Sequence, residues 1–530
     1  MHAARSLSLL VPARHRLPTI GPIQMADRSL ADAYDIIIVG SGMGGGTLAY
    51  ALRESGARIL LVERGDFIPS EPENWSPEAV FGDGRYQSDD RWQAADGRWY
   101  RPGMTYAVGG NTKVFGASLP RFRPSDFKEA VHADGVSPAW PFGYDDLAPY
   151  YAAAEVIFGV HGQPEEGVTS VRSSAFPYPP VPHEPAIQDL ADRLTKAGYT
   201  PSYLPLGIDL RPDGRCIRCA TCDGFVCEVN AKADADIRCV RPALQQENVE
   251  IVTAAYARRI LTDDSGQRVS GVELVRGGRV SVVRAGLIVV SCGAVNSAAL
   301  LLRSGNDQHP HGLANSSGLV GRHYMVHNNT VMLTVKPAQR NDAVFQKTLY
   351  VNDFYDHGTD DHPYPLGHIQ LIGKVREPMI RKQARMAPRW ARRYLTSRSV
   401  DWWLFTEDLP DPGNRIEVTS DGAIRVHWQP NNVRAHEVLV REARRMARAA
   451  GYPLTLTRRA GIEVCSHQAG TIRTGTDPAT SVLDPSCRTH DIENLYVVDS
   501  SFFPSLPVMN PALTIAANAL RVGEQLAAGR

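Results

Sequence analysis

The chain has 530 residues, and its 57 basic side chains balance its 57 acidic ones. Because a single hydrophobic core stops growing at about 250–300 residues, we expect at least two domains. The balanced charge lacks the basic excess of a protein that binds nucleic acid, and no apolar run reaches the roughly 18 residues of a transmembrane segment.

The first 24 residues contain Arg and His but no acidic residue, and their apolar run SLSLLV is too short for a secretory signal. We interpret residues 1–24 as a disordered extension, or as a start assigned too early before Met25, with a targeting segment as the alternative. We therefore expect a cytoplasmic protein.

A strand, a glycine-rich turn, a helix and a second strand follow one another between Tyr34 and Glu63. The β-branched run Ile36–Val39 ends at the glycines, Thr47–Ser55 has the composition of a helix, and Arg58–Glu63 has the pattern of a buried strand. This order predicts a βαβ unit of the kind that binds a dinucleotide.

Within this unit, Gly40, Gly42 and Gly45 form the pattern G-x-G-x-x-G. Gly40 would permit the tight turn, Gly42 would let backbone N–H groups approach a pyrophosphate, and Gly45 would let the helix pack closely on the strand. Glu63 ends the second strand, where it could accept hydrogen bonds from ribose hydroxyls. A glycine turn without a ligand is the alternative interpretation.

Four cysteines lie within the stretch CIRCATCDGFVC, at the spacing C-x2-C-x2-C-x4-C. The spacing resembles a ferredoxin cluster loop, but the last gap is longer and no proline follows it. We interpret these cysteines as structural thiols or a disulfide pair, with an iron–sulfur cluster or a zinc site as alternatives; they are Cys216, Cys219, Cys222 and Cys227.

The α/β pattern continues in strand-like and helix-like stretches farther along the chain, which are Val249–Thr253, Gly271–Val275, Leu287–Ser291, Ser297–Arg303, Leu495–Asp499 and Pro511–Gly523. Between residues 330 and 457, alternating pieces such as Thr330–Val335 and Ile416–Thr419 instead suit an antiparallel sheet. One nucleotide-binding domain is thus expected from distant segments, with a second domain inserted.

The stretch Lys374–Arg398 carries nine Lys and Arg residues against one acidic residue, Glu377. We interpret it as a solvated, partly helical excursion. The alternative is a lid, a membrane-surface contact or a subunit contact, whose apolar side would be formed by Trp390, Tyr394, Trp402 and Trp403.

Motifs along nearly the whole chain, from Tyr34 to Leu526, together resemble the glucose–methanol–choline (GMC) family of flavoprotein oxidoreductases. The stretch VGSGMGGGTLAYALRESGARILLVERG looks like the FAD fingerprint, RPGMTYAVGGNTKVFGA like the segment along the flavin, and SHQAGTIRTGTDPATSVLDPSC like the C-terminal half-site. The stretches WPFGYDDLAPYY and CGAVNSAALLLRSG are similar to two further family signatures, and TEDLPDPGNRIEV resembles the strand entry of the substrate domain.

This resemblance implies an α/β fold with two parts. A Rossmann-like FAD-binding domain would be built from the discontinuous segments 25–135, 236–329 and 460–530. Residues 136–235 and 330–459 would form the inserted substrate-binding domain, with a largely antiparallel sheet and cap segments.

The resemblance also implies the active site. His467, the first His of H-x-x-G-T, would face flavin N5 and take the hydroxyl proton of an alcohol as hydride leaves its carbon. Asn510 would hold the substrate oxygen, and the helix beginning at Pro511 would direct its positive end at the flavin. Further FAD contacts are implied for Gly109, Gly110, Asn111, Thr112 and Asp499.

Some members of the family link FAD covalently through a His shortly after the Gly-Gly pair. Val114 occupies the matching place and offers no nucleophile, so we expect non-covalent FAD.

We expect the substrate to be a sugar or glycoside whose secondary hydroxyl becomes a ketone. The alternatives are a sterol or small alcohol, or an iron–sulfur-containing sugar dehydrogenase that feeds an electron-transfer chain. The electron acceptor would be oxygen, a quinone or another organic compound, with an organic acceptor slightly favoured. The sequence leaves the oligomeric state open.

Overall fold

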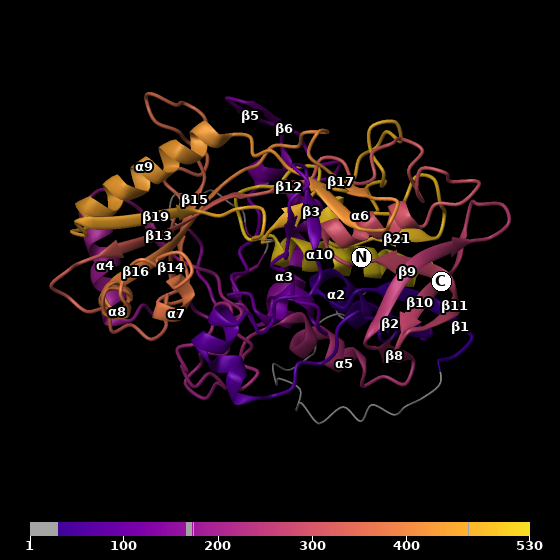
Figure 1. Cartoon of the computed structure of the whole chain (residues 1–530), viewed down its shortest axis with the longest axis horizontal. Helices are drawn as coiled ribbons and strands as arrows, with labels where there is room; N and C mark the ends of the chain where they lie inside the picture. Colours follow the sequence, from indigo (N-terminus) through magenta and orange to yellow (C-terminus); the bar gives the residue numbers. More distant parts are fainter. Residues whose placement is uncertain (1–29, 166–171, 173, 465, 530) are drawn as a thin grey trace.

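The computed structural model describes residues 30–165, 172, 174–464 and 466–529. The expected extension, residues 1–24, lies outside the described residues. Figure 1 shows two lobes side by side, each built around one sheet, and the early and late parts of the chain meet in the lobe that contains both ends of the described chain.

The first sheet has seven strands in the order β8-β2-β1-β11-β10-β9, and β21 also pairs with β11. Its pairs β8-β2, β2-β1, β1-β11 and β11-β21 are parallel, whereas β9, β10 and β11 form antiparallel pairs. The strands are β1 (Ala33–Val39), β2 (Ile59–Val62), β8 (Val249–Val252), β9 (Ala255–Thr262), β10 (Val269–Arg276), β11 (Arg279–Val290) and β21 (Leu495–Val497). A mainly parallel sheet from distant segments is therefore confirmed.

The helix after β1, α2 (Met43–Leu52), begins four residues before the expected Thr47 and ends before Ser55. Its first turn consists largely of glycines because the backbone packs closely there. A Cβ on Gly45 would lie 1.9 Å from the Gly40 carbonyl oxygen, and one on Gly44 would lie 2.4 Å from the Val498 carbonyl oxygen. Close packing therefore outweighs the low helix propensity of glycine.

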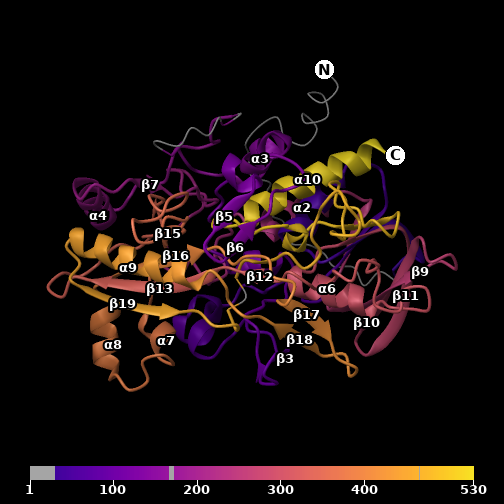
Figure 2. The ribbon, with the colours of Figure 1, turned by 90° about the horizontal axis from the view of Figure 1, so that it is seen from above.

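Helix α10 (Ala512–Ala528) packs against α2, and both lie beside the first sheet (Figure 2). Helix α6 (Ala294–Arg303) follows β11 directly and packs on β9, which confirms the expected second strand-to-helix passage. Helices α3 (Tyr144–Phe158) and α5 (Arg241–Ala243) complete this lobe.

The second sheet has six antiparallel strands in the order β19-β13-β16-β15-β14-β7. Helices α4 (Pro185–Lys196) and α9 (Val433–Ala449) form a core with one of its faces, whereas α7 (Glu377–Ile380) and α8 (Arg389–Thr396) lie on the other side (Figure 1). The strands are β7 (Pro201–Tyr203), β13 (Asn328–Val335), β14 (Leu349–Val351), β15 (His368–Leu371), β16 (Ser399–Thr406) and β19 (Leu454–Arg459).

Strand alternation separates two sets of side chains on this sheet. Met332 and Trp402 are buried in the core with α9, while Val331 and Trp403 belong to a smaller cluster with α7 and α8. Successive residues of a strand point to opposite faces, so one face builds the core and the other remains for the cavity described below.

The expected strand at Ile416–Thr419 does not belong to this antiparallel sheet. β17 (Arg415–Val418) pairs with β18 (Ile424–His427), which continues through β3 (Trp92–Ala94) to β4 (Trp99–Tyr100). The alternating pattern identified a strand but could not specify its partner, because pairing depends on distant segments. The remaining short strands form two antiparallel pairs. β5 (Ala130–His132) pairs with β6 (Gly135–Ser137), and β12 (Met325–Val326) pairs with the distant β20 (Gln468–Ala469).

Within the described ranges, no helix is long and apolar enough to cross a membrane. The basic stretch 374–398 folds partly into α7 and α8, and it exposes Met386, Trp390 and Tyr394. The division of the chain into the two domains given above remains a prediction.

Candidate active site

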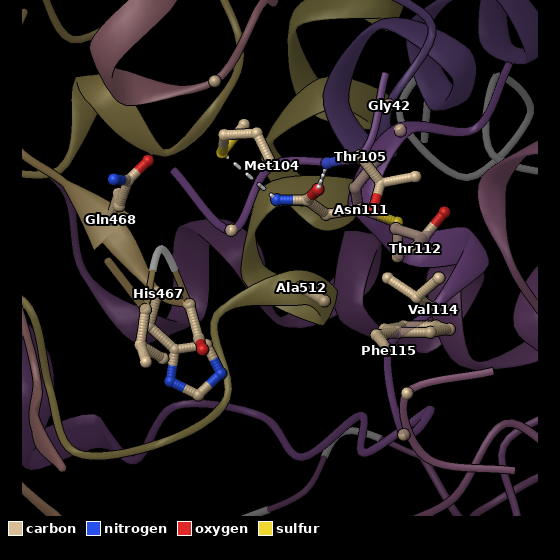
Figure 3. A pocket seen from close by; sticks show the side chains of 18 of the residues that line it. Gly42, Met104, Thr105, Asn111, Thr112, Val114, Phe115, His467, Gln468 and Ala512 are labelled. Atoms are coloured by element: carbon tan, nitrogen blue, oxygen red, sulfur yellow. Dashed lines mark hydrogen bonds between the residues drawn. The ribbon is translucent and has the colours of Figure 1, made fainter. Parts of the chain in front are cut away.

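A cavity of about 1150 Å³ lies between the two lobes and is lined from both. The first sheet contributes the glycine-rich turn and the end of β2, and the second sheet contributes the face opposite α9. Figure 3 shows Gly42, Thr112 and Phe115 around this cavity, with His467 on the opposite side of Ala512 from Phe115.

The glycine-rich turn shapes one end of the cavity. Gly40 has a φ of +100°, and a Cβ there would lie 2.1 Å from the Ser291 carbonyl oxygen, so the tight turn requires glycine. At Gly42, by contrast, an added Cβ would have no described atom within 4 Å beyond its chain neighbours. Gly42 is also the N-cap of α2 and provides no side-chain cap. The N-terminal end of α2 thus lies against the cavity, where its N–H groups and positive dipole end suit a pyrophosphate.

Glu63 lines the same end and is almost fully buried. Its Oε2 accepts hydrogen bonds from the Ser41 backbone N (3.0 Å) and Oγ (2.6 Å), and its Oε1 accepts one from the Gly65 backbone N (2.9 Å). Burial raises the pKa of Glu63, although these hydrogen bonds oppose the shift. The side chain is thus fixed in place at this end of the cavity, and its contact with a ribose remains a prediction.

Asp499 lines the cavity but is largely occupied by the protein. Its Oδ2 accepts from Gly293 N (3.0 Å) and Ser297 Oγ (2.5 Å), and its Oδ1 accepts from Ser501 N (2.8 Å) and Ser501 Oγ (2.5 Å). The carboxylate therefore joins the start of α6 to the turn after β21. Its direct contact with FAD remains a prediction.

The segment after Tyr106 forms another wall of the cavity. Gly109 and Gly110 have φ values of +90° and +55°, and the Asn111 Oδ1 accepts a hydrogen bond from Thr105 N at 2.9 Å (Figure 3). The Thr112 Oγ1 donates to the Gly109 carbonyl and accepts from Ala235 N. The two polar side chains hold the shape of the segment, and its glycines let the backbone turn beside the cavity.

His467 and Asn510 lie together on the cavity wall, as expected from the sequence. The Asn510 Nδ2 lies 3.3 Å from the His467 Nε2, and the Asn510 Oδ1 accepts a hydrogen bond from Ser118 Oγ at 2.8 Å. Since Ser118 occupies the amide oxygen, the amide N–H₂ group is directed to His467.

His327 makes the second contact to His467, with 3.0 Å between the two Nδ1 atoms. The other nitrogen of His327, Nε2, lies 2.9 Å from the Pro507 carbonyl oxygen, which can only accept. The Nε2 of His327 therefore carries the proton, its Nδ1 accepts from His467 Nδ1–H, and the His467 Nε2 is unprotonated, with a lone pair that accepts from the Asn510 Nδ2 at 3.3 Å. This arrangement leaves a proton acceptor on the wall of the cavity.

Burial holds the pKa of His467 well below its usual value, with further lowering by His327 and by Lys347. Burial likewise lowers the pKa of His327 to about 4. Both rings are therefore neutral near pH 7, and His467 is available as a base. The ring of His467 also stacks on that of Trp403 with a centroid distance of 6.2 Å.

The backbone of His467 is in the left-handed region, with a φ of +60°. A non-glycine residue rarely adopts this conformation, which is found preferentially at functional sites. Helix α10 begins next to Asn510, with Pro511 as its N-cap and no side-chain cap, so its positive end also lies at the cavity.

Comparison with known protein families identifies the family of the chain. The two models of the GMC oxidoreductase family match residues 34–329 and 381–519. The chain belongs to the GMC oxidoreductase family.

Two relatives of this GMC oxidoreductase are 6'''-hydroxyparomomycin C oxidase of Streptomyces lividus and paromamine 6'-oxidase of Streptomyces fradiae. Each is 32% identical; the alignments cover 97% of this chain and 95% of the first relative, and 93% of this chain and 91% of the second. The crystal structure of a pyridoxine 4-oxidase shares the fold, with a TM-score of 0.65 at 19% identity over 93% of this chain and 98% of that one.

FAD, the cofactor of the family, fits the residues present in this GMC oxidoreductase. The open space at Gly42, the uncapped start of α2, the buried carboxylate of Glu63 and the volume of the cavity suit the parts of a dinucleotide. The residues that would hold it are those predicted from the sequence: Gly40, Gly42, Gly45, Glu63, Gly109, Gly110, Asn111, Thr112 and Pro511.

The four clustered cysteines are free thiols, and no group of three or more His, Cys, Asp or Glu side chains in the described ranges is arranged to hold a metal. Burial raises the pKa of the Cys222 thiol to about 12. The loop is fixed by Lys232, whose Nζ donates to the carbonyls of Phe115 (2.9 Å), Cys222 (3.2 Å) and Phe225 (2.5 Å). A buried lysine thus joins the cysteine loop to the cavity segment.

The sequence did not indicate His327 or Ser118 as site residues. His327 lies between β12 and β13, 140 residues before His467, and Ser118 is 392 residues before Asn510. No motif marks either residue, since their roles depend on side chains that meet only in the folded chain.

Proposed function

We propose that this GMC oxidoreductase uses non-covalent FAD to oxidise an alcohol to a carbonyl compound, with His467 as the base. The observation that carries the proposal is the unprotonated Nε2 of His467, fixed on the cavity wall in contact with the Asn510 amide. A neutral imidazole in this position can accept a hydroxyl proton.

FAD, when bound, accepts the hydride that leaves the alcohol carbon. The protein supplies the other functions. A substrate hydroxyl can donate to the His467 Nε2 and accept from the Asn510 Nδ2, since these two atoms lie 3.3 Å apart. As the proton moves to Nε2, the ring becomes positively charged, and its Nδ1–H bond to His327 strengthens. Ser118 keeps the amide of Asn510 in the orientation that this contact needs.

Non-covalent attachment is supported by Val114, which lines the cavity at the place where some members carry a linking His. An aliphatic side chain cannot form the bond. Denaturation and precipitation of the purified protein should release the yellow chromophore into the supernatant. A chromophore that stays with the precipitated protein would contradict this part of the proposal.

A secondary hydroxyl of a sugar or glycoside is the substrate that we favour. The names of the two relatives from Streptomyces, both oxidases of compounds with sugar rings, support a sugar or glycoside, whereas the choice of a secondary hydroxyl is our own expectation. A quinone or other organic acceptor is proposed ahead of oxygen. A cytoplasmic location remains a prediction.

The central test is the His467→Ala variant. It should retain FAD and fold normally, but reduce its flavin with substrate about 10² to 10⁴ times more slowly, the usual range for a lost base. The substrate panel would contain free sugars, aryl glycosides, sterols and simple alcohols, each assayed for hydrogen peroxide and for dye reduction. A variant that reduces its flavin at nearly the normal rate would remove His467 from the mechanism.

A further inference from the structure

The part of the cavity around His467 has a polar end. Gln370 lines it, and the Gln370 Nε2 has no hydrogen-bond partner among the residues that the structure describes. Nearby, Lys347 Nζ and Asp223 Oδ2 form an ion pair of 2.8 Å, and both residues line the same cavity. Together with Asn510, these groups can bind the oxygens of a hydroxylated ring.

The wall beyond this end is largely apolar, with Gln383, Thr457 and Arg458 as its polar residues. It is formed by the cavity face of the second sheet, by the segment containing α7 and α8, and by aromatic side chains near the cysteine loop. Its apolar residues are Phe81, Phe115, Val331, Leu333, Ile372, Val375, Met379, Ile380, Ala384, Leu395, Trp403 and Leu456. A substrate that consisted only of a sugar would leave this wall without an apolar partner.

The acidic residues of the cavity argue against a substrate with several positive charges. Its acidic residues within the described ranges are Glu63, Asp223 and Asp499. Asp223 is paired with Lys347, Asp499 accepts four hydrogen bonds, and Glu63 accepts three at the nucleotide end. A sugar with several ammonium groups would therefore find no free carboxylate near His467.

We propose that the substrate is a neutral glycoside with an apolar aglycone. Its sugar hydroxyl lies at His467 and Asn510, and its aglycone packs against the apolar wall. This inference rests on the proposed function, because His467 defines the position of the reacting hydroxyl. An apolar alcohol without a sugar would leave the polar groups of Gln370 unused.

The first test measures binding separately from turnover. Calorimetry on the FAD-loaded His467→Ala variant would compare glucose, galactose, mannose and xylose, each as free sugar, methyl pyranoside and phenyl pyranoside. A 2-amino-2-deoxyglucoside and cyclohexanol complete the set. Phenyl glycosides should bind about 10- to 100-fold more tightly than methyl glycosides, since an aromatic ring leaves water for an apolar surface.

Equal affinity for methyl and phenyl glycosides would overturn the inference, as would binding of cyclohexanol or the amino sugar in preference to every neutral glycoside, or no binding of any glycoside. Flavin reduction in the unmodified enzyme is a separate readout. Glycoside preference without any flavin reduction would refute the proposed function and leave the binding inference standing, so the two failures are distinguishable.

The chain offers a matched pair of variants for the second test. Leu456 and Leu454 lie on the same strand, β19, and are 42% and 41% exposed, but only Leu456 lines the cavity. Leu456→Asn should reduce the preference for phenyl over methyl glycosides several-fold, while Leu454→Asn should leave it unchanged. Equal effects of the two variants would contradict an aglycone site at this wall.

Discussion

Replacement of His327 tests whether a second histidine fixes the proton position on the base. In the His327→Leu variant, the His467 Nδ1–H loses the acceptor that now lies 3.0 Å away. The His467 ring can then turn or move its proton to Nε2, and either change removes the lone pair that faces the cavity. The variant should therefore fold and bind FAD but react slowly.

The size of the effect follows from the charge on the ring. The contact between the two histidines becomes charge-assisted when His467 takes the proton, and such a bond contributes about 1.5–3 kcal/mol. At about 1.4 kcal/mol per tenfold change, flavin reduction should slow by about 10- to 150-fold. In His327→Gln, the amide oxygen can still accept from His467, so part of the rate should return.

The assay is anaerobic stopped-flow reduction of the flavin at saturating substrate, over a range of pH. Flavin content and melting temperature serve as controls, because a purely structural role for His327 would lower both without changing the rate per bound flavin. A normal rate per flavin in His327→Leu would refute this reasoning. If His327→Gln is as slow as His327→Leu, the hydrogen-bond acceptor for His467 Nδ1–H does not explain the slower flavin reduction.

Three further changes have defined outcomes. Asn510→Ala should slow flavin reduction by about 10-fold, since it removes one hydrogen bond to the substrate oxygen; a loss greater than that of His467→Ala would reverse the two roles. Gly42→Val should keep its melting temperature as apoprotein but lose FAD, because its side chain would enter open space in the cavity, and full flavin absorbance would count against this site. Burial lowers the pKa of His327 to about 4 and of His368 and His436 to about 3. The unfolded chain takes up these protons at about pH 6.5, so the three rings lower stability as pH falls from about 6.5 toward about 3–4, whereas Asp126 and Asp408, whose pKa burial raises to about 7, act in the opposite sense. The urea midpoint of His436→Leu should therefore fall less over this range than that of the unmodified protein, and an equal fall would contradict a neutral buried ring.

The parts of the site that the sequence predicted are those in which one short segment contains the whole pattern. The glycines from Gly40 to Gly45 and the stretch from His467 to Thr471 are contiguous, and their chemistry is evident from residue type and spacing. The mainly parallel sheet was predictable for a similar reason, because buried strands such as β1 and β11 are continuous apolar runs.

The parts that the sequence could not predict depend on which segments meet. His327 gains its role from a carbonyl at Pro507 and a ring at His467, both far away in the chain. The apolar wall could not be recognised either, because alternation in β13 and β16 shows two faces but not which one meets a cavity. The start of α2 was placed too late because glycine was interpreted by its propensity and not by the close packing that it permits.

The left-handed backbone of His467 has a consequence for the evolution of this enzyme. Glycine or asparagine would adopt a φ of +60° with less strain, and such strain is typically worth about 1–3 kcal/mol. Selection for thermal robustness alone would therefore tend to replace this histidine, whereas selection for turnover retains it. Directed evolution toward higher thermal stability should accordingly keep residue 467 unchanged and select stabilising substitutions elsewhere in the protein.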